Sequence, residues 1–204
     1  MTIQNALWDG DTASALDSIY NYQVSGETIT WYYEEVGSFP SYFDEVNLII
    51  QKTDNIIDLD FEYTDDYDRA DLVIYVRDFG DPINEDGNLG TFLDNGEWGE
   101  IEVFIDSDDS SESSINTAVH ELGHYLGLGE PGYDARFDQL DTAMSYNEND
   151  GLEGGFQTFF VDNDLSALLQ WHGAEDDRLS SPAQSFLVDY NVTVGNIVRQ
   201  WIDS

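Results

Sequence analysis

The chain has 204 residues, which suits one domain with a small appendage and is long enough to bury a substantial core. Its 43 acidic residues against 6 Lys and Arg give a net charge of −37, while 41% of the residues are hydrophobic. This composition argues against a disordered chain and against binding to nucleic acid or anionic membranes. Because cysteine is absent, disulfides and zinc–thiolate sites are excluded.

The first half of the chain alternates extended and helical patterns. Val46, Ile49 and Ile50 fall three and four residues apart, which predicts an amphipathic helix over about 41–55. The apolar run from Leu72 to Val76 is typical of a buried strand, whereas residues 100–105 alternate as a strand with one wet face does. Strands are predicted at Thr28–Tyr33, Leu59–Tyr63, Asp71–Arg77, near Gly90–Leu93 and at Glu100–Ile105.

Helices are the main expectation for the second half. A capping box with Asp109 as the N-cap and a left-handed Gly127 after the last turn predict a helix over Glu112–Leu126. A third helix is predicted over about Asp162–Trp171. Residues 176–204 carry two short strand-like runs and a final helical turn. The order of elements, strands around one helix and then helices, predicts an α/β or α+β domain.

The sequence His120-Glu121-Leu122-Gly123-His124 lies inside the second predicted helix. Residues four apart share one helix face, so both imidazoles can reach one metal ion. Glu121 is displaced round the helix from His120 and is free to hold and deprotonate a metal-bound water, which is the chemistry of zinc-dependent peptide hydrolysis. The third histidine, His172, is interpreted as a capping or surface residue at a helix end.

The motif continues to Gly127 and Glu130 and is followed by Ala143-Met144-Ser145-Tyr146. In this pattern the chain resembles the metzincin metallopeptidases, and with the Ser-Tyr pair after the methionine it most resembles the serralysin-like family. The resemblance implies an α+β catalytic domain: a twisted, mostly parallel sheet with an antiparallel edge strand, an active-site helix, and a smaller C-terminal part with a Met-turn and a terminal helix. It covers residues 13–175, with 1–12 as an N-terminal extension and 176–204 as a C-terminal extension of unknown role.

The resemblance also implies roles for single residues. Met144 would form a floor beneath the metal without binding it, and Tyr146 would donate a hydrogen bond to the developing oxyanion. The edge strand near residues 90–93 would pair with an extended substrate.

Position 130 departs from the family, whose members usually have His there, or Asp in some. Glutamate binds zinc in His₂Glu sets on other folds, so the ligand set is expected to be His120, His124 and Glu130. An anionic third ligand lowers the positive charge of the site and should make a bound water less acidic. Two alternatives stay open: Glu130 does not bind the metal, or Asp134 or Asp138 on the same loop takes its place.

These residues predict a zinc-dependent endopeptidase, a hydrolase in which Glu121 is the general base and Tyr146 assists the oxyanion. One alternative is a catalytically silent metzincin relative that acts as a metal-containing binding module, against which the retention of Glu121 argues. Another is an acidic structural protein with an accidental motif. Zn²⁺ is the expected cofactor; Ca²⁺ in the acidic loop 106–112 is a further prediction, although helix capping and solvation explain that loop more simply.

The expected partner is a basic or neutral peptide or protein substrate, because the acidic surface repels acidic peptides. We expect a monomer, with neither nucleic acid nor a membrane as partner. Residues 1–11 lack the regions of a signal peptide, and no segment is apolar over the roughly 18 residues of a membrane span. The resemblance implies an extracellular enzyme, secreted without a recognisable N-terminal signal peptide. The acidic excess predicts a surface that stays hydrated at high salt.

Overall fold

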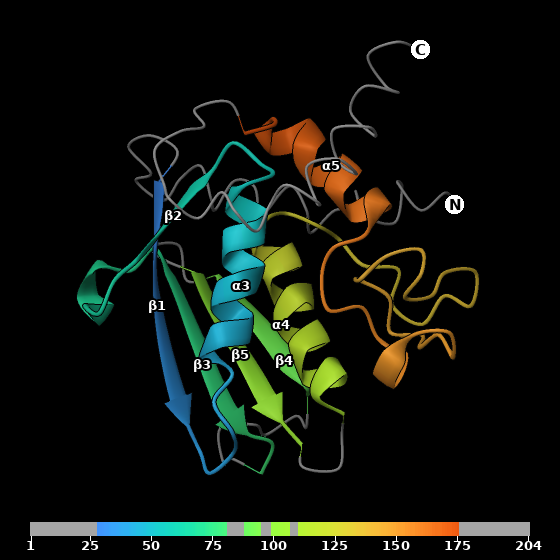
Figure 1. Ribbon diagram of the computed structural model, residues 1–204, viewed down its shortest axis with the longest axis horizontal. Helices are drawn as coiled ribbons and strands as arrows, with labels where there is room; N and C mark the ends of the chain where they lie inside the picture. The colour runs from blue at the N-terminus through green and yellow to red at the C-terminus, as the bar shows by residue number, and fades with distance from the viewer. Residues whose placement is uncertain (1–27, 81–87, 95–98, 107–109, 176–204) are drawn as a thin grey trace.

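The protein is described by a computed structural model, which covers residues 28–80, 88–94, 99–106 and 110–175. Its centre is a five-stranded sheet with the strand order β2-β1-β3-β5-β4 (Figure 1). Four strands are parallel, and β4 pairs antiparallel with β5. This confirms the predicted sheet with its antiparallel edge strand. The strands are β1 (Thr28–Val36), β2 (Asp60–Tyr63), β3 (Leu72–Asp78), β4 (Gly90–Asp94) and β5 (Gly99–Ile105).

The middle strand, β3, carries the apolar run that predicts it. Leu72, Ile74 and Val76 are each at most 3% exposed, and the neighbouring strands contribute Ile29 and Val103 to the same core. The strand is paired along both edges, with β1 and with β5, so its backbone groups lie inside the ladder. The expectation that β5 has one wet face is wrong: Glu102 and Phe104 are 5% and 4% exposed, so residues on both faces of this strand are buried.

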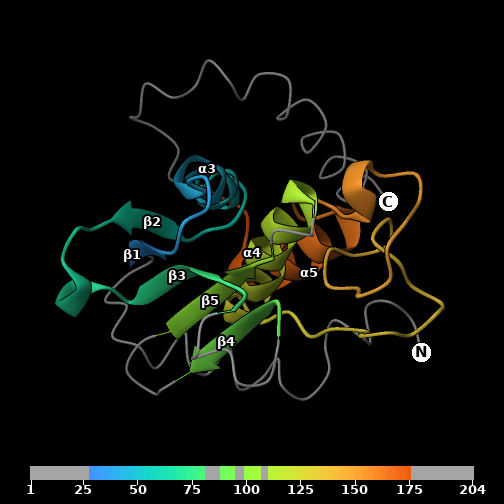
Figure 2. The same ribbon diagram turned by 90° about the horizontal axis from the view of Figure 1, so that it is seen from below.

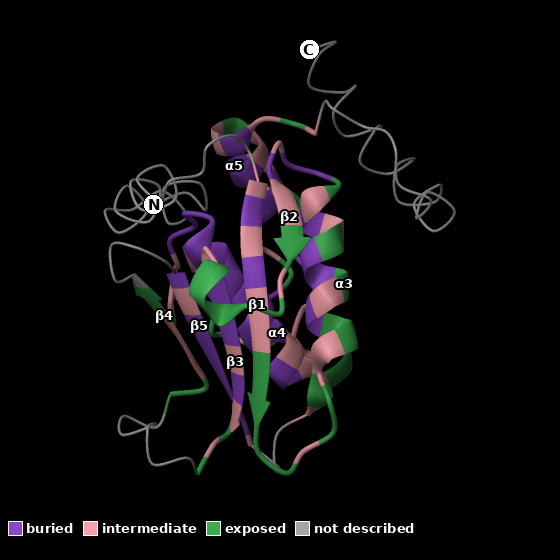
Figure 3. Cartoon of the chain, turned by 90° about the vertical axis from the view of Figure 1, so that its left-hand side faces the viewer, coloured by how far each residue is buried: buried purple, intermediate pink, exposed green. Residues whose placement is uncertain are grey.

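Two helices cover one face of the sheet, α3 (Phe43–Asp54) and α4 (Ser111–Tyr125) (Figures 2 and 3). The buried residues of α3 include Val46, Ile49 and Ile50, which confirms the helical spacing. Helix α4 packs against β4 and β5, next to the antiparallel edge of the sheet. A third helix, α5 (Asp162–His172), follows the irregular segment that comes after α4.

The structure corrects the expected start of α4. The N-cap is Ser110, whose side chain accepts a hydrogen bond from the backbone N–H of Ser113 at 3.1 Å, so the capping box on Asp109 is wrong. The same acceptor chemistry operates one residue later, and boundaries of this kind shift easily because several residues in the run can cap. The end of the helix is as expected, since Gly127 has φ = 95°.

Two short 3-10 helices, η1 (Tyr67–Arg69) and η2 (Glu153–Gly155), had no periodic signal in the sequence. The predictions for residues 1–12 and 176–204 lie outside the described residues. Within the described part of the chain, no helix combines the length and the apolar character needed to cross a membrane.

Hydrogen bonds join the residues after α5 to the segment between α3 and β2. Ile57 and Ala174 form an isolated antiparallel bridge, and the N–H of Glu175 donates to the carbonyl of Ile56 at 3.1 Å. Because α5 is anchored in this way, the irregular segment between α4 and α5 spans two fixed ends. That segment carries both Glu130 and Met144.

Candidate metal centre

Helix α4 presents His120 and His124 on one face, one helical turn apart. Their ring centroids are 4.7 Å apart, and their Nε2 atoms are 3.1 Å apart. Gly123 lies between them, and a Cβ there would come within 2.5 Å of Met144 Sδ. The glycine therefore lets the Met-turn, residues Thr142–Ser145, pack closely under the helix, with Met144 fully buried.

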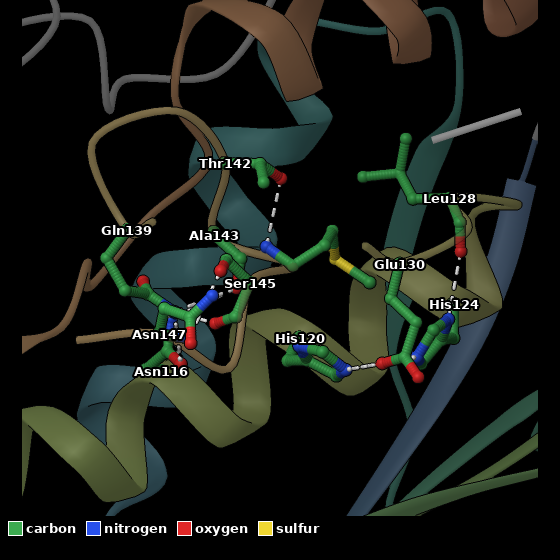
Figure 4. A network of polar contacts seen from close by, with 11 residues as sticks. Asn116, His120, His124, Leu128, Glu130, Gln139, Thr142, Ala143, Ser145 and Asn147 are labelled. Atoms are coloured by element: carbon green, nitrogen blue, oxygen red, sulfur yellow. Dashed lines mark hydrogen bonds and ion pairs between the residues drawn. The ribbon is translucent and has the colours of Figure 1, made fainter. Parts of the chain in front are cut away.

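A sharp reversal after α4 returns the chain to the same place. Gly127 adopts positive φ, and the N–H of Leu128 donates to the carbonyl of Gly123 at 2.8 Å. The carbonyl of Leu128 then lies 2.9 Å from His124 Nδ1 (Figure 4). Two residues later, Glu130 Oε2 lies 2.9 Å from His120 Nε2 and 3.5 Å from His124 Nε2.

These three side chains fit a zinc ion. A carbonyl oxygen only accepts hydrogen bonds, so His124 Nδ1 carries the proton, and in the neutral ring Nε2 keeps its lone pair for a metal. Ligand atoms of a tetrahedral site with bonds of about 2.1 Å lie about 3.4 Å apart, close to the 2.9–3.5 Å found between these atoms. Among the residues that the structure describes, this is the group of side chains that could hold a metal ion.

Electrostatics favour an ionised Glu130. Burial acts against this, yet the close contacts with the His120 and His124 rings and the hydrogen bond from Tyr146 hold the pKa of Glu130 well below its usual range. Tyr146 is affected in the opposite direction: burial and its hydrogen bond to Glu130 raise the pKa of the phenol. Tyr146 also stacks on His120, with ring centroids 5.3 Å apart and an interplanar angle of 29°. It therefore remains a protonated hydrogen-bond donor beside the candidate ligands.

Glu121 lies between the candidate ligands and the edge strand. It is 7% exposed, and a Cβ built on Gly90 of β4 would lie 2.7 Å from its Oε1 atom. Burial raises the pKa of Glu121, and the nearby Glu130 adds to this, whereas His120 and His124 oppose it. A carboxylate with raised proton affinity, next to the candidate metal ligands and to a strand edge, is chemically able to accept a proton from a water molecule.

The structure also places the alternatives that the sequence left open. Asp134 pairs with Arg136 on the surface, and Asp138 accepts a hydrogen bond from Asn149 at 2.9 Å. Neither carboxylate belongs to the group of close ligand atoms that His120 and His124 form with Glu130. His172 is not a surface residue. It is 7% exposed, and its Nε2 lies 2.9 Å from the carbonyl of Leu126, so it caps the end of α4. Calcium at 106–112 stays a prediction, since residues 107–109 lie outside the described part.

Sequence reasoning missed the polar side chains that support the Met-turn. Asp164 of α5 is fully buried and accepts hydrogen bonds from Thr142 Oγ1 and from the N–H of Ala143; burial raises its pKa to about 6. Asn116 and Gln139 face each other beneath the same turn. Asn116 was detectable in principle, because it lies four residues before His120 on the same helix face. Gln139 lies in an irregular segment that has no periodicity to follow.

Comparisons with known proteins give one informative match. No family model matches the chain. Metalloendoproteinase 1-MMP of Arabidopsis thaliana is 40% identical over 90 residues, which cover 37% of this chain and 25% of that protein. The likeness is to a metalloendoproteinase. The chain spans about a quarter of the length of this curated relative.

Two solved structures of myroilysin are also similar to this chain. The first is 14% identical with a TM-score of 0.45, and the match covers 79% of this chain and 98% of that one. The second is 15% identical with a TM-score of 0.35, and the match covers 80% of this chain and 70% of that one. None of these names bears on the serralysin-like assignment, which stays a prediction.

Proposed function

We propose that this protein is a zinc-dependent endopeptidase of the metzincin type, with His120, His124 and Glu130 as the metal ligands. The observation that carries the proposal is the convergence of three ligand atoms from a helix and the loop after it, next to the buried carboxylate of Glu121. The match to a metalloendoproteinase supports the reaction class. The Ser145-Tyr146 pair after Met144 favours the serralysin-like branch, with residues 13–175 as the catalytic domain.

The chain's own residues then have separate tasks. A bound zinc would supply Lewis-acid polarisation of the peptide carbonyl and would lower the pKa of a water molecule. Glu121 accepts the proton of the attacking water and later delivers it to the leaving amine. Tyr146 turns its hydroxyl from Glu130 to the developing oxyanion. An extended substrate adds to the edge of β4, whose first residue lies against Glu121.

The cellular setting and partners belong to the same proposal. We place the enzyme outside the cell, as a monomer acting on peptide or protein substrates that are basic or neutral. The net charge of −37 supports the substrate preference, since a carboxylate-rich surface attracts cationic peptides. It also supports a working environment of high salt, where self-repulsion is screened.

The first test is to measure bound metal in the wild type and in Glu130→Ala, together with hydrolysis of casein. We expect one equivalent of zinc and cleavage that a chelator abolishes, both lost or strongly weakened in the variant, because two histidines alone hold zinc poorly. Asp134→Ala, which removes a nearby carboxylate outside the ligand group, is the matched control and should keep both. Zinc without cleavage over a wide range of pH and salt would instead support the catalytically silent relative.

A further inference from the structure

A pair of buried primary amides holds the Met-turn against α4. Asn116 and Gln139 are 6% and 0% exposed and face each other beneath the turn (Figure 4). Asn116 Nδ2 donates to Gln139 Oε1 at 3.0 Å and to the carbonyl of Gln157 at 2.9 Å. Gln139 Nε2 donates to the carbonyl of Ser145 and, at 3.3 Å, to Asn116 Oδ1. Both amide groups are therefore hydrogen-bonded throughout, as buried polar groups require.

The amide pair is connected to the candidate site from both sides. Asn116 lies one helical turn before His120 on α4. Gln139 holds the carbonyl of Ser145, and the next N–H, that of Tyr146, donates to the carbonyl of Gly132 at 3.1 Å. The peptide group between Ser145 and Tyr146 is thus fixed at its oxygen and at its nitrogen. Tyr146 follows this fixed peptide group, and its ring stacks on that of His120.

Apolar residues could fill the same space but could not set the orientation of this peptide group. Packing of apolar groups is not directional, whereas a hydrogen bond from a buried amide fixes the direction of the carbonyl that accepts it. A fully satisfied polar network in the interior also rigidifies the segments that it joins. The arrangement therefore suits a task that depends on the placement of one side chain.

We propose that Asn116 and Gln139 are positioning residues that hold the Tyr146 hydroxyl where it can reach the oxyanion. This inference rests on the proposed function. Within the described residues, the two amides bond to each other and to backbone groups rather than to the three candidate metal ligands, and they act through the backbone of Ser145. Their loss should therefore lower kcat while zinc affinity and KM change little.

The test uses Gln139→Met, which keeps the length of the side chain and removes both its donor and its acceptor, and Asn116→Ser as a second variant. We expect kcat to fall roughly tenfold or more with KM and zinc affinity within about twofold, because a small misplacement of a catalytic group is costly. Asn163→Ser is the matched control: it removes an amide that donates to the carbonyl of Asp141 at 2.7 Å, away from Tyr146, and should keep kcat.

A double-mutant cycle separates positioning from general stability. In a Tyr146→Phe background, Gln139→Met should cost no further activity, because the hydroxyl that it positions is already gone. Hydrogen exchange provides a readout that does not depend on activity or metal: the amide of Tyr146 should exchange at least tenfold faster in the variant, while the amides of α4 near His124 keep their rates.

Each outcome either supports or overturns the positioning role. An equal loss of kcat in the Tyr146→Phe background, a parallel loss of zinc affinity, or an unchanged exchange rate at Tyr146 would overturn the inference. Wild type that binds zinc but cleaves nothing would defeat the proposed function instead, and the exchange experiment would still decide whether the amide pair holds Tyr146. If Gln139→Met does not fold, Asn116→Ser gives the same readouts.

Discussion

At the scale of single residues, Glu121 has the environment that a general base requires. Burial raises its pKa, so it takes up a proton more readily than a solvated carboxylate does. Glu121→Gln keeps the shape and cannot accept a proton, so we expect kcat to fall by about 10²- to 10⁴-fold with zinc content unchanged. Casein hydrolysis and zinc analysis measure the two effects. Glu112→Gln at the start of the same helix is the control, and near-normal activity of Glu121→Gln would refute the assigned role.

Gly90 is a second residue with a role at the candidate site: because it has no side chain, Glu121 and Thr117 can pack closely against the backbone of β4. A Cβ at this position would lie 2.4 Å from Thr117 Cγ2 and 2.7 Å from Glu121 Oε1, so Gly90→Ala must displace the carboxylate or the edge strand. We expect kcat to fall roughly tenfold. Gly80→Ala, whose Cβ would meet no atom of the described residues within 4 Å, should leave kcat unchanged. Equal kinetics of the two variants would show that Glu121 does not depend on this close contact.

At the scale of elements, His172 joins α5 to the end of α4. Its Nδ1 is buried without a hydrogen-bond partner among the described residues, and burial lowers the pKa of His172 below its ordinary value of 6.5. As the pH falls below 6.5, the unfolded histidine gains a proton before the folded one does, so the free energy of unfolding decreases. The decrease is about 1.4 kcal/mol for each unit by which the two pKa values differ.

His172→Gln removes this titration and keeps an amide that can donate to the carbonyl of Leu126. Urea unfolding of both proteins at about pH 7.5, 6 and 5 should show that the wild type loses more stability on acidification than the variant does. The difference between the two proteins isolates His172 from the many carboxylates that titrate in both. Parallel curves would mean that His172 charges as easily in the folded protein as in the unfolded chain.

At the scale of the whole molecule, the net charge of −37 predicts which substrates approach the site. The potential of a carboxylate-rich surface speeds the approach of basic peptides and slows that of acidic ones. The test compares cleavage of matched peptides that differ only in flanking Lys or Glu. At about 0.01 M salt, where the Debye length is about 30 Å, the Lys peptides should be cleaved faster. At about 1 M salt, where the Debye length is about 3 Å, this preference should shrink. Equal cleavage of both sets at low salt would contradict this prediction.

Local patterns in the chain are enough to predict its main elements and the part of the site that lies on α4. The run from Leu72 to Val76 and the spacing of Val46, Ile49 and Ile50 identify β3 and α3, because burial follows the period of the local backbone. His120 and His124 share a face because the helix repeats every 3.6 residues. Glu130 was expected beside them from the resemblance to the metzincins, and the reversal at Gly127 returns it to the two histidines. Each of these inferences involves residues within one element or one turn.

Contacts between residues far apart in the chain became known from the folded molecule alone. Four features follow no local period in the sequence. They are the strand order, the burial of His172 against Leu126, the support of the Met-turn by Asp164, and the contact of Gly90 with Glu121. The Asn116–Gln139 pair is the clearest case, since 23 positions separate two polar side chains that their residue types alone would place in solvent. Their burial is favourable because each satisfies the other, and that condition is met after the chain has folded.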